Sequence, residues 1–473
     1  MDLFLYVQFS VLSAAVEVEV SDGAGSADPC RGRYVYVHDL PPRFNADIIR
    51  DSRKYQDHWG DMCGVVSNAG LGRPLADRAD GVITGEAGWY STHQFELDAI
   101  FHNRMKQYEC LTNHSAVANA VFVPFYAGFD FARYHWGYDN ATRDAASVDL
   151  AKWLMARPQW RRMWGRDYFL VAGRTGWDFR RSNNVDPDWG NDLLAMPAGR
   201  NMSVLVLETT LITGKHHKHS FFIYIFWSDA DVLGWQDRVR GQRRAWLMAF
   251  VGAPRPDTPA PFQHGEHPGP GSRHRAVQGV QRLRHAGVRA LPRQPPVPRP
   301  RRHHAAVPED KLLPAAAGDS CTRRSVFDSM VAGCIPVFFH TASAYKQYRW
   351  HLPRDHLNYS VYIPDADVRR RNVSIEAVLR AIPPATVERM REEVIKLIPR
   401  VLYADPRSRL ETIKDAVDIA VEGVLDTVAQ IKKGEYVDSG QPVSEDPPNL
   451  YVSTESRFRP KSVVSRTMTR HRR

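Results

Sequence analysis

Four apolar runs in the first half of the chain place the tightest limit on its fold. They are continuous rather than alternating, turn residues bound them, and helical patterns lie between them. A strand that is apolar at every position must be buried on both faces, which is typical of parallel sheets covered by helices. The sequence therefore predicts an α/β fold with strands at Tyr34–Leu40, Ala120–Gly128, Asp167–Gly173 and Met202–Glu208.

Helical spacing of apolar residues predicts the elements around these strands. A helix is expected at Ser91–Met105, because Ser91 and Gln94 have the spacing of a capping box. A second α/β unit is predicted to begin with a strand at Ala245–Ala253. Later helices are predicted at 374–382, 386–398 and 409–433.

The length and charge of the chain bear on its domain count and its partners. A chain of 473 residues is too long for one compact core, so we expect two domains. The net charge of +10 comes from two arginine-rich stretches, Thr258–Pro308 and Ser456–Arg473. The rest of the chain is mildly acidic, so we do not expect a nucleic-acid partner.

The segment Pro254–Pro308 interrupts the second α/β unit. It is rich in Pro, Arg, His, Gly and Ala and has almost no large apolar residue. Such a composition buries too little surface to offset the entropy cost of ordering the chain. Two interpretations remain open: a disordered linker, or the product of a GC-rich gene read in the wrong frame.

Cysteines and sequons indicate the cellular compartment. The five cysteines fit no zinc motif, but in a lumenal chain two of Cys30, Cys63 and Cys110 would pair, and the sequence leaves the pairing open. Five N-glycosylation sequons favour a secretory-pathway protein. Their acceptor residues are Asn113, Asn140, Asn201, Asn358 and Asn372.

The stretch "GDSCTRRSVFDSMVAGCIPVFF" (Gly318–Phe339) carries the clearest candidate site. Arg323 and Arg324 stand at the start of a predicted helix, where the macrodipole is already positive. A bound anion explains this arrangement, because free N–H groups, two guanidinium groups and nearby hydroxyls would hold a diphosphate. In the alternative interpretation the arginines pair with Asp319 and Asp328.

This stretch resembles the nucleotide-sugar signature of the exostosin-like family, glycosyltransferase family 47, in its plant xyloglucan galactosyltransferase branch of the MURUS/KATAMARI type. "YVYVHDLPPRFN", "FVPFYAGFD" and "WGRDYFLVAGRTGWDFRR" carry the same resemblance. It implies a GT-B fold, in which two Rossmann-like domains face each other across a cleft. It also implies a Golgi membrane anchor and inverting transfer of a sugar, expected to be galactose, from a UDP-sugar to a wall polysaccharide such as xyloglucan. A catalytically impaired lumenal scaffold with an incomplete donor domain is the alternative.

The resemblance also implies roles for individual residues. Inversion needs a general base, for which the candidates are Asp98 and His38, the latter at the end of the first strand. No essential metal or other cofactor is expected, because the arginines and the helix dipole would neutralise the leaving diphosphate. The nucleotide-sugar site would contain Ser320, Arg323, Arg324, Ser325, Asp328 and Gly333.

The resemblance divides the chain into four parts. We predict an N-terminal segment with a missing or degraded anchor, an acceptor-side domain, a nucleotide-sugar domain interrupted by aberrant or disordered sequence, and a basic tail. Their ranges are 1–29, 30–240, 241–433 with the interruption at 254–310, and 434–473.

Overall fold

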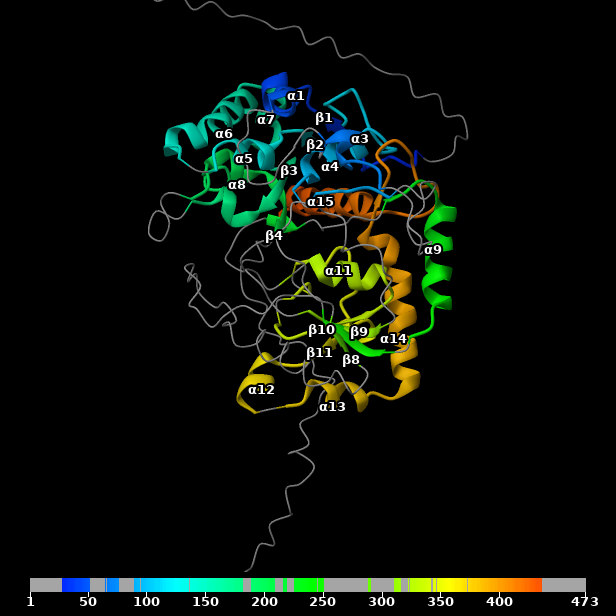
Figure 1. Ribbon diagram of the computed structural model, residues 1–473. Helices are drawn as coiled ribbons and strands as arrows, with labels where there is room; N and C mark the ends of the chain where they lie inside the picture. Colours follow the sequence, from blue (N-terminus) through cyan, green and yellow to red (C-terminus); the bar gives the residue numbers. More distant parts are fainter. Residues whose placement is uncertain are drawn as a thin grey trace, which may run out of the picture.

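Two parallel sheets organise the computed structural model of the chain, one above the other in Figure 1. The structure describes residues 28–51, 64, 66–75, 89–93, 95–135, 137–181, 189–208, 216–218, 225–244, 246–250, 288–290, 310–315, 322, 324–341, 343–345, 347–371 and 373–435.

The first sheet contains five parallel strands in chain order: β1 (Val35–Val37), β2 (Ala120–Val123), β3 (Tyr168–Thr175), β4 (Ser203–Glu208) and β5 (His216–Lys218). Successive residues of a strand serve different cores. In β2, Phe122 packs in one hydrophobic cluster, whereas Val121 and Val123 pack in the other. The sheet is therefore covered on both faces, which confirms the interpretation of the continuous apolar runs.

The second sheet has a different strand order. Its spatial order is β8-β7-β9-β10-β11, so the second strand in the chain lies outside the first. This doubly wound order contains a topological switch point between β7 and β9, where ligands characteristically bind outside the carboxyl ends of the strands. The strands are β7 (Trp246–Phe250), β8 (Val288–Ala290), β9 (Asp310–Ala315), β10 (Ile335–Phe338) and β11 (Val361–Tyr362).

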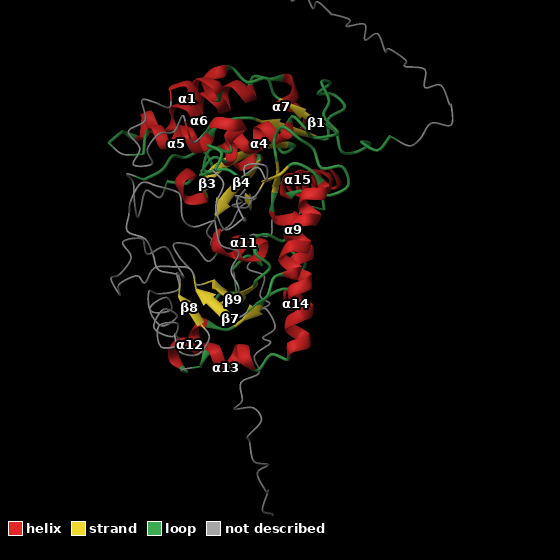
Figure 2. Cartoon of the chain, turned by 45° about the vertical axis from the view of Figure 1, so that its right-hand side comes forward, coloured by secondary structure: helices red, strands yellow, loops and turns green. Residues whose placement is uncertain are grey.

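Helices cover both sheets, as Figure 2 shows. Around the first sheet lie α1 (Ala46–Arg50), α3 (Ser67–Gly70), α4 (Leu97–Met105), α5 (Ala127–Arg133), α6 (Asn140–Met155), α7 (Pro158–Met163) and α8 (Pro197–Asn201). The later helices are α9 (Asp229–Gly241), α11 (Arg324–Val331), α12 (Asp365–Arg370), α13 (Ile375–Arg380), α14 (Pro384–Leu397) and α15 (Ala416–Lys433). Short 3-10 turns are η1 (Pro42–Phe44), η4 (Gly176–Phe179), η6 (His356–Asn358) and η7 (Ile398–Val401).

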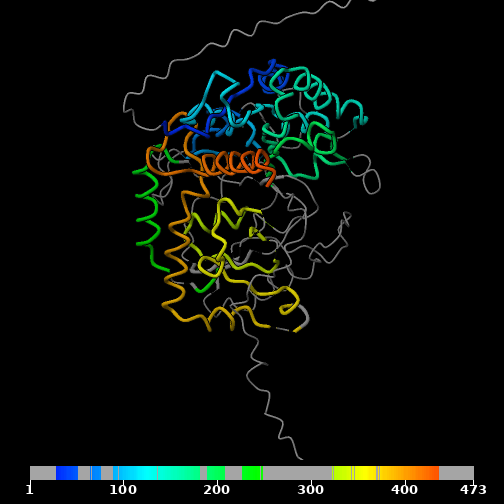
Figure 3. Tube along the Cα trace, turned by 180° about the vertical axis from the view of Figure 1, so that it is seen from behind, coloured from blue at the N-terminus to red at the C-terminus, as the bar shows by residue number. Residues whose placement is uncertain are grey.

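The chain crosses between the two halves of the molecule twice. Helix α9, expected in the first domain, packs along α14, and its Trp235 donates a hydrogen bond to the carbonyl oxygen of Val331 in α11 (Figure 3). Helix α15, expected in the second domain, packs against α4 and β2 of the first sheet. The crossing segments pair with each other as strands β6 (Ile225–Phe226) and β12 (Tyr403–Ala404).

Two helices begin later than the sequence predicts. The helix expected from Ser91 begins at Leu97, because residues 89–92 hydrogen-bond in extended form to residues 71–75. Ser91 therefore lies before the helix, whose N-cap residue is Glu96. The helix expected from residue 409 begins at Ala416, where the Asp415 side chain caps the first turn by accepting from the Asp418 amide.

The interrupted second unit contains more regular structure than expected. Strand β8 lies inside the stretch 254–308, for which the sequence predicts no order, and pairs with β7. Strand β9 follows and lies between β7 and β10. The remainder of the stretch, 254–287 and 291–308, lies outside the described residues. The second sheet thus has five strands, and a scaffold with an incomplete donor domain is not favoured.

Cys30 and Cys110 form a disulfide that joins the entry to β1 with the loop after α4. This is one of the pairings that the sequence left open. Cys334 is buried and free, and Cys63 and Cys321 fall outside the described residues. Among the helices of the described part, none is both long and apolar enough to cross a membrane.

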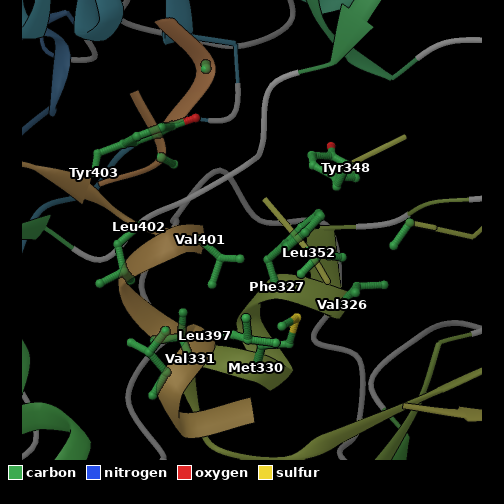
Figure 4. Packing of buried hydrophobic residues seen from close by; sticks show 14 of the residues in the cluster. Val326, Phe327, Met330, Val331, Tyr348, Leu352, Leu397, Val401, Leu402 and Tyr403 are labelled. Atoms are coloured by element: carbon green, nitrogen blue, oxygen red, sulfur yellow. The ribbon is translucent and has the colours of Figure 1, made fainter. Parts of the chain in front are cut away.

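Helix α11 carries the arginine motif and is fixed by its apolar face. Val326, Phe327, Met330 and Val331 are buried, and Figure 4 shows this part of α11 in one cluster with Leu352, Leu397 and Val401. The ring of Phe327 meets that of Tyr348 edge-on at 4.5 Å between centroids. Gly333 ends the helix with φ +68°, as expected for a residue at this position.

A buried ion cluster links α4 to the start of α15. The Arg104 side chain is 2% exposed; its Nε lies 2.9 Å from Asp415 Oδ2 and its Nη2 lies 2.9 Å from Asp418 Oδ2. Asp415 also accepts a hydrogen bond from the Ala404 amide in β12. The Arg104 guanidinium therefore joins α4 to the start of α15, and Asp415 extends this contact to β12.

We expect Arg104→Met to lower the free energy of unfolding by about 3–5 kcal/mol, because two carboxylates lose their buried partner. Chemical denaturation of the full chain measures this loss. Arg43→Met is the matched control, since Arg43 and Asp149 form an exposed pair worth at most about 1 kcal/mol. Equal losses in the two variants would contradict a stabilising role for the cluster.

Candidate active site

The carboxyl ends of the two sheets meet in the middle of the molecule. The carbonyl oxygen of Leu207, near the end of β4, accepts hydrogen bonds from Gln347 Nε2 and Tyr348 Oη, each at 3.1 Å. Both donors lie in the loop after β10. Figure 2 shows α11 between the two sheets at this level. Residues at the ends of strands from both sheets therefore share one region.

The N-terminus of α11 lies at the switch point of the second sheet. The helix follows β9 and begins at Arg324. Thr322 precedes it, is fully buried, and accepts a hydrogen bond from the Ala344 amide at 3.0 Å. The start of α11 is thereby attached to the loop after β10. Ser320 and Arg323, two members of the predicted diphosphate site, fall outside the described residues.

Arg324 and Asp328 form the pair that the alternative interpretation of the motif predicts. Arg324 Nε lies 3.4 Å from Asp328 Oδ2, one turn along the helix. A guanidinium has five N–H donors, so this pair does not exclude an anion at the same arginine. Ser325 is half-buried in the first turn beside it. The two interpretations of the motif are thus compatible at Arg324.

Gly333, a member of the predicted nucleotide-sugar site, lies at the opposite end of α11 from Arg324. It follows the last turn of α11, and a helix of eight residues extends about 12 Å. A Cβ at Gly333 would lie 2.1 Å from the Val239 side chain in α9. The missing side chain therefore serves close packing and a positive φ, which are structural requirements.

Asp98 lies in the first turn of α4 and is 2% exposed. Its Oδ1 accepts hydrogen bonds from the amides of Gly173 at 3.2 Å and Gly128 at 3.4 Å. Its Oδ2 has no hydrogen-bond partner within the described ranges. Burial raises the pKa of Asp98 to about 7, although the two amides and Arg174 favour its charged form. Such a pKa suits a general base near neutral pH.

Two glycines make room for this carboxylate. A Cβ on Gly128 would lie 2.6 Å from Asp98 Oδ2, and a Cβ on Gly173 would lie 2.4 Å from it. Gly128 is in the first turn of α5, and Gly173 is in β3. Any side chain at either position would push the carboxylate out of its place. Gly128 and Gly173 therefore belong to the candidate site, because each leaves space for the Asp98 carboxylate.

Two further titratable groups lie on the same segment. Glu96 is fully buried, its carboxylate oxygens make no hydrogen bond to the described side chains, and burial raises its pKa well above the usual value. His93 is half-buried, and its Nδ1 accepts from the Phe95 amide. Burial and the positive charges of Arg174 and Arg324 lower the pKa of His93 to about 4. His93 is therefore neutral at physiological pH.

The two arginines that lower the pKa of His93 come from different sheets. Arg174 lies near the carboxyl end of β3, and Arg324 lies at the start of α11. The paired strands bring these ends together, because Thr175 of β3 lies beside Glu208 of β4 and the Leu207 carbonyl accepts from Tyr348. The Tyr348 ring in turn packs on Phe327 of α11.

His38, the second candidate base, lies elsewhere. Its Nε2 is 3.2 Å from the Tyr168 hydroxyl, and its ring packs among Tyr36, Trp153 and Tyr168. Burial, and secondarily Arg157, lower its pKa to about 4. In the described part of the chain it contacts neither Asp98 nor the residues of α11. The structure gives His38 the surroundings of a structural histidine.

Sequence reasoning missed Arg174, Glu96 and His93. Arg174 belongs to the string "GRTGWDFRR", which carried the family resemblance, but nothing in that string distinguishes this arginine from the others. Glu96 was hidden by the expected longer helix, in which it would be an ordinary helical residue. Among the described residues, no three His, Cys, Asp or Glu side chains converge as a metal site would require.

The four sequons in the described residues differ in accessibility. Asn113 and Asn140 are exposed. The amide nitrogen of Asn201 donates to the Trp164 carbonyl at 2.8 Å, and that of Asn358 donates to Asp355 at 2.9 Å. The serines of these last two sequons, Ser203 and Ser360, are at most 1% exposed. Asn372 lies outside the described residues.

The chain belongs to the exostosin GT47 family of glycosyltransferases, because residues 29–379 match the Exostosin GT47 domain. This range contains both sheets and α11.

Within this family, the chain is similar to plant enzymes that act on xyloglucan. The chain is 48% identical over 433 residues to xyloglucan galactosyltransferase MUR3 of Arabidopsis thaliana, covering 90% of this chain and 66% of that protein. It is 41% identical to the probable xyloglucan galactosyltransferase GT12 of the same plant, over 86% of this chain and 78% of the relative. It is 30% identical to xyloglucan-specific galacturonosyltransferase 1, also from Arabidopsis thaliana, over 85% of this chain and 58% of that protein.

Glycan occupancy should follow the accessibility of the sequons. We expect glycans at Asn113 and Asn140, and little or none at Asn201 and Asn358, whose amide nitrogens are hydrogen-bonded in the fold. Glycopeptide mass spectrometry of plant-expressed protein, with and without peptide-N-glycosidase, measures occupancy at each site. High occupancy at Asn358 in folded protein would contradict the arrangement of η6.

The raised pKa of Asp98 predicts a dependence of stability on pH. Because the folded state binds this proton more tightly than the unfolded state, its stabilising effect is present at low pH and is lost as pH rises toward about 7. Asp98→Asn removes one titrating group, so between pH 4.5 and 7 its unfolding free energy should fall less steeply, by up to about 1.4 kcal/mol per pH unit. Denaturation at several pH values measures both slopes, and equal slopes would contradict the assignment.

Proposed function

We propose that this chain is an inverting galactosyltransferase that moves galactose from UDP-galactose to xyloglucan. One observation carries the proposal: a buried carboxylate with a pKa near 7 and the arginine-bearing start of α11 lie where the carboxyl ends of two parallel sheets meet. The relatives named above are xyloglucan galactosyltransferases, and their activity suggests the sugar and the polysaccharide. The arrangement agrees with a GT-B-like fold, which we propose as its architecture.

The proposed reaction assigns one task to each side of the site. Asp98 removes the proton from the acceptor hydroxyl as the oxygen attacks the anomeric carbon of galactose. The bond between that carbon and the diphosphate breaks, and UDP leaves with the electron pair. Arg324, together with Arg323 and Ser320 from outside the described residues, neutralises the diphosphate with the α11 dipole. Asp328 and Ser325 are proposed to bind the nucleotide, and no metal is essential.

We further propose that the protein acts in the Golgi lumen and is attached to its membrane. The disulfide between Cys30 and Cys110 supports this placement, because such bonds persist in oxidising compartments. The exposed sequons at Asn113 and Asn140 support it as well. Both features lie on the half of the molecule that carries the first sheet.

A transfer assay tests the proposal. The full chain, given UDP-galactose and a galactose-free xyloglucan oligosaccharide, should yield a product that is one hexose heavier, with a β-linkage by NMR and with equal rate in a chelator. Asp98→Asn should lower kcat by about 10²–10⁴-fold, the usual range for a general base, and leave UDP binding unchanged. The exposed Asp149 provides the control variant Asp149→Asn, which should retain full activity.

Each part of the proposal has its own contrary outcome. Transfer from UDP-galacturonate in preference to UDP-galactose would overturn the donor assignment. Full activity in Asp98→Asn would overturn the base assignment. Loss of activity in chelator, with recovery on adding a divalent cation, would overturn the metal-independent mechanism.

A further inference from the structure

Arg174 is a buried arginine at the carboxyl end of β3 to which neither the family signature nor the proposed reaction gives a task. It is 4% exposed. Its guanidinium carbon lies 4.2 Å from the ring centre of Phe95 and 4.6 Å from that of Phe131. Two aromatic faces therefore hold the planar group in one orientation.

Asp178 accepts a hydrogen bond from the Arg174 side chain. Its Nε lies 3.2 Å from Asp178 Oδ2, and Asp178 Oδ1 in turn accepts from the indole N–H of Trp189 at 3.0 Å. Among the described residues, the side chain that accepts a hydrogen bond from Arg174 is Asp178, and it accepts from Nε. An anion that accepts from both terminal nitrogens would form two charge-assisted hydrogen bonds, which are stronger than neutral ones.

Arg174 lies near both Asp98 and the region at the start of α11. Its charge acts on Asp98, the proposed base, and on His93, which also feels Arg324. Among the described residues Asp98 is not such an acceptor, because its Oδ1 accepts from two backbone amides and no hydrogen bond joins it to Arg174.

Strand pairing gives the geometry: Thr175, next to Arg174, lies beside Glu208 of β4. The neighbouring Leu207 carbonyl accepts from Tyr348, whose ring packs on Phe327 of α11. Arg174 and α11 therefore lie at the same meeting point of the two sheets, where a multivalent anion would reduce the repulsion between their cations.

We propose that Arg174 binds the diphosphate of the sugar nucleotide from the first sheet, opposite Arg324 and the start of α11. This inference rests on the proposed transferase function and adds a donor-binding residue to it. The terminal nitrogens of Arg174 form a fork that matches two phosphate oxygens, and the Phe95–Phe131 stack keeps the fork in place without a donor. The donor is then held by both halves of the molecule at once.

Binding of UDP and of uridine to Arg174→Lys tests the inference. Lysine keeps the charge but removes the planar fork, so the dissociation constant for UDP in calorimetry should rise at least tenfold. Binding of uridine, which lacks the diphosphate, should not change. The matched control is Arg181→Lys, since Arg181 is an equally buried arginine of the same half, paired with Asp144 and Asp192. That variant should bind UDP like the parent.

Other outcomes overturn the assignment. A UDP dissociation constant within twofold of the parent value, in a folded variant, removes Arg174 from the donor site. The same binding with an acid limb of the kcat profile moved to higher pH shows that Arg174 acts only on Asp98. If Arg174→Lys does not fold, Arg174→Gln, which keeps an N–H donor in the stack, is measured in the same way and judged by the same limits.

The test is independent of the sugar and the acceptor. A parent protein that binds UDP but transfers no galactose contradicts the proposed function and leaves the assignment of Arg174 to be decided by the binding data alone. A parent that transfers galactose while Arg174→Lys binds UDP normally contradicts only the assignment of Arg174.

Discussion

The buried ion cluster of Arg104 fixes the helix on which the candidate chemistry depends. Helix α4 carries Asp98 in its first turn and Arg104 in its last, so the contact of Arg104 with Asp415 sets where the whole helix lies. Asp415 is itself held by the Ala404 amide and caps α15. The helix that carries the proposed base is therefore held in part by a segment that follows the second sheet in the chain.

The parts of the fold that follow from local pattern were predictable, and those that depend on distant partners were not. Continuous apolar runs require burial on both faces, and β2 shows it, with Phe122 and Val121 in different cores. The pattern of α15 shows that one face is apolar but does not say which sheet covers it. The start of α4 at Leu97 likewise depends on pairing of residues 89–92 with residues 71–75, far from any local signal.

The candidate site was chosen from local patterns, and the roles of its residues stay predictions. Asp98 was proposed from its place on a helix before the second strand, and the arginines at a helix start indicated α11. The surroundings of Asp98 were not predicted. Gly128 and Gly173 leave space for its carboxylate, and they meet it only in the folded chain. The aromatic neighbours of the His38 ring likewise depend on distant parts of the chain, and its place at the end of a strand did not indicate them.

The pairing of β6 with β12 has a consequence for stability. The polypeptide passes between the halves at two places, and these passages pair as parallel strands, with Tyr403 opposite Ile225 and Ala404 opposite Phe226. Because the two passages share one ladder, each supplies the backbone partners of the other, and a change that displaces one strand leaves the other with unpaired backbone groups. The two passages between the halves are thus coupled in stability.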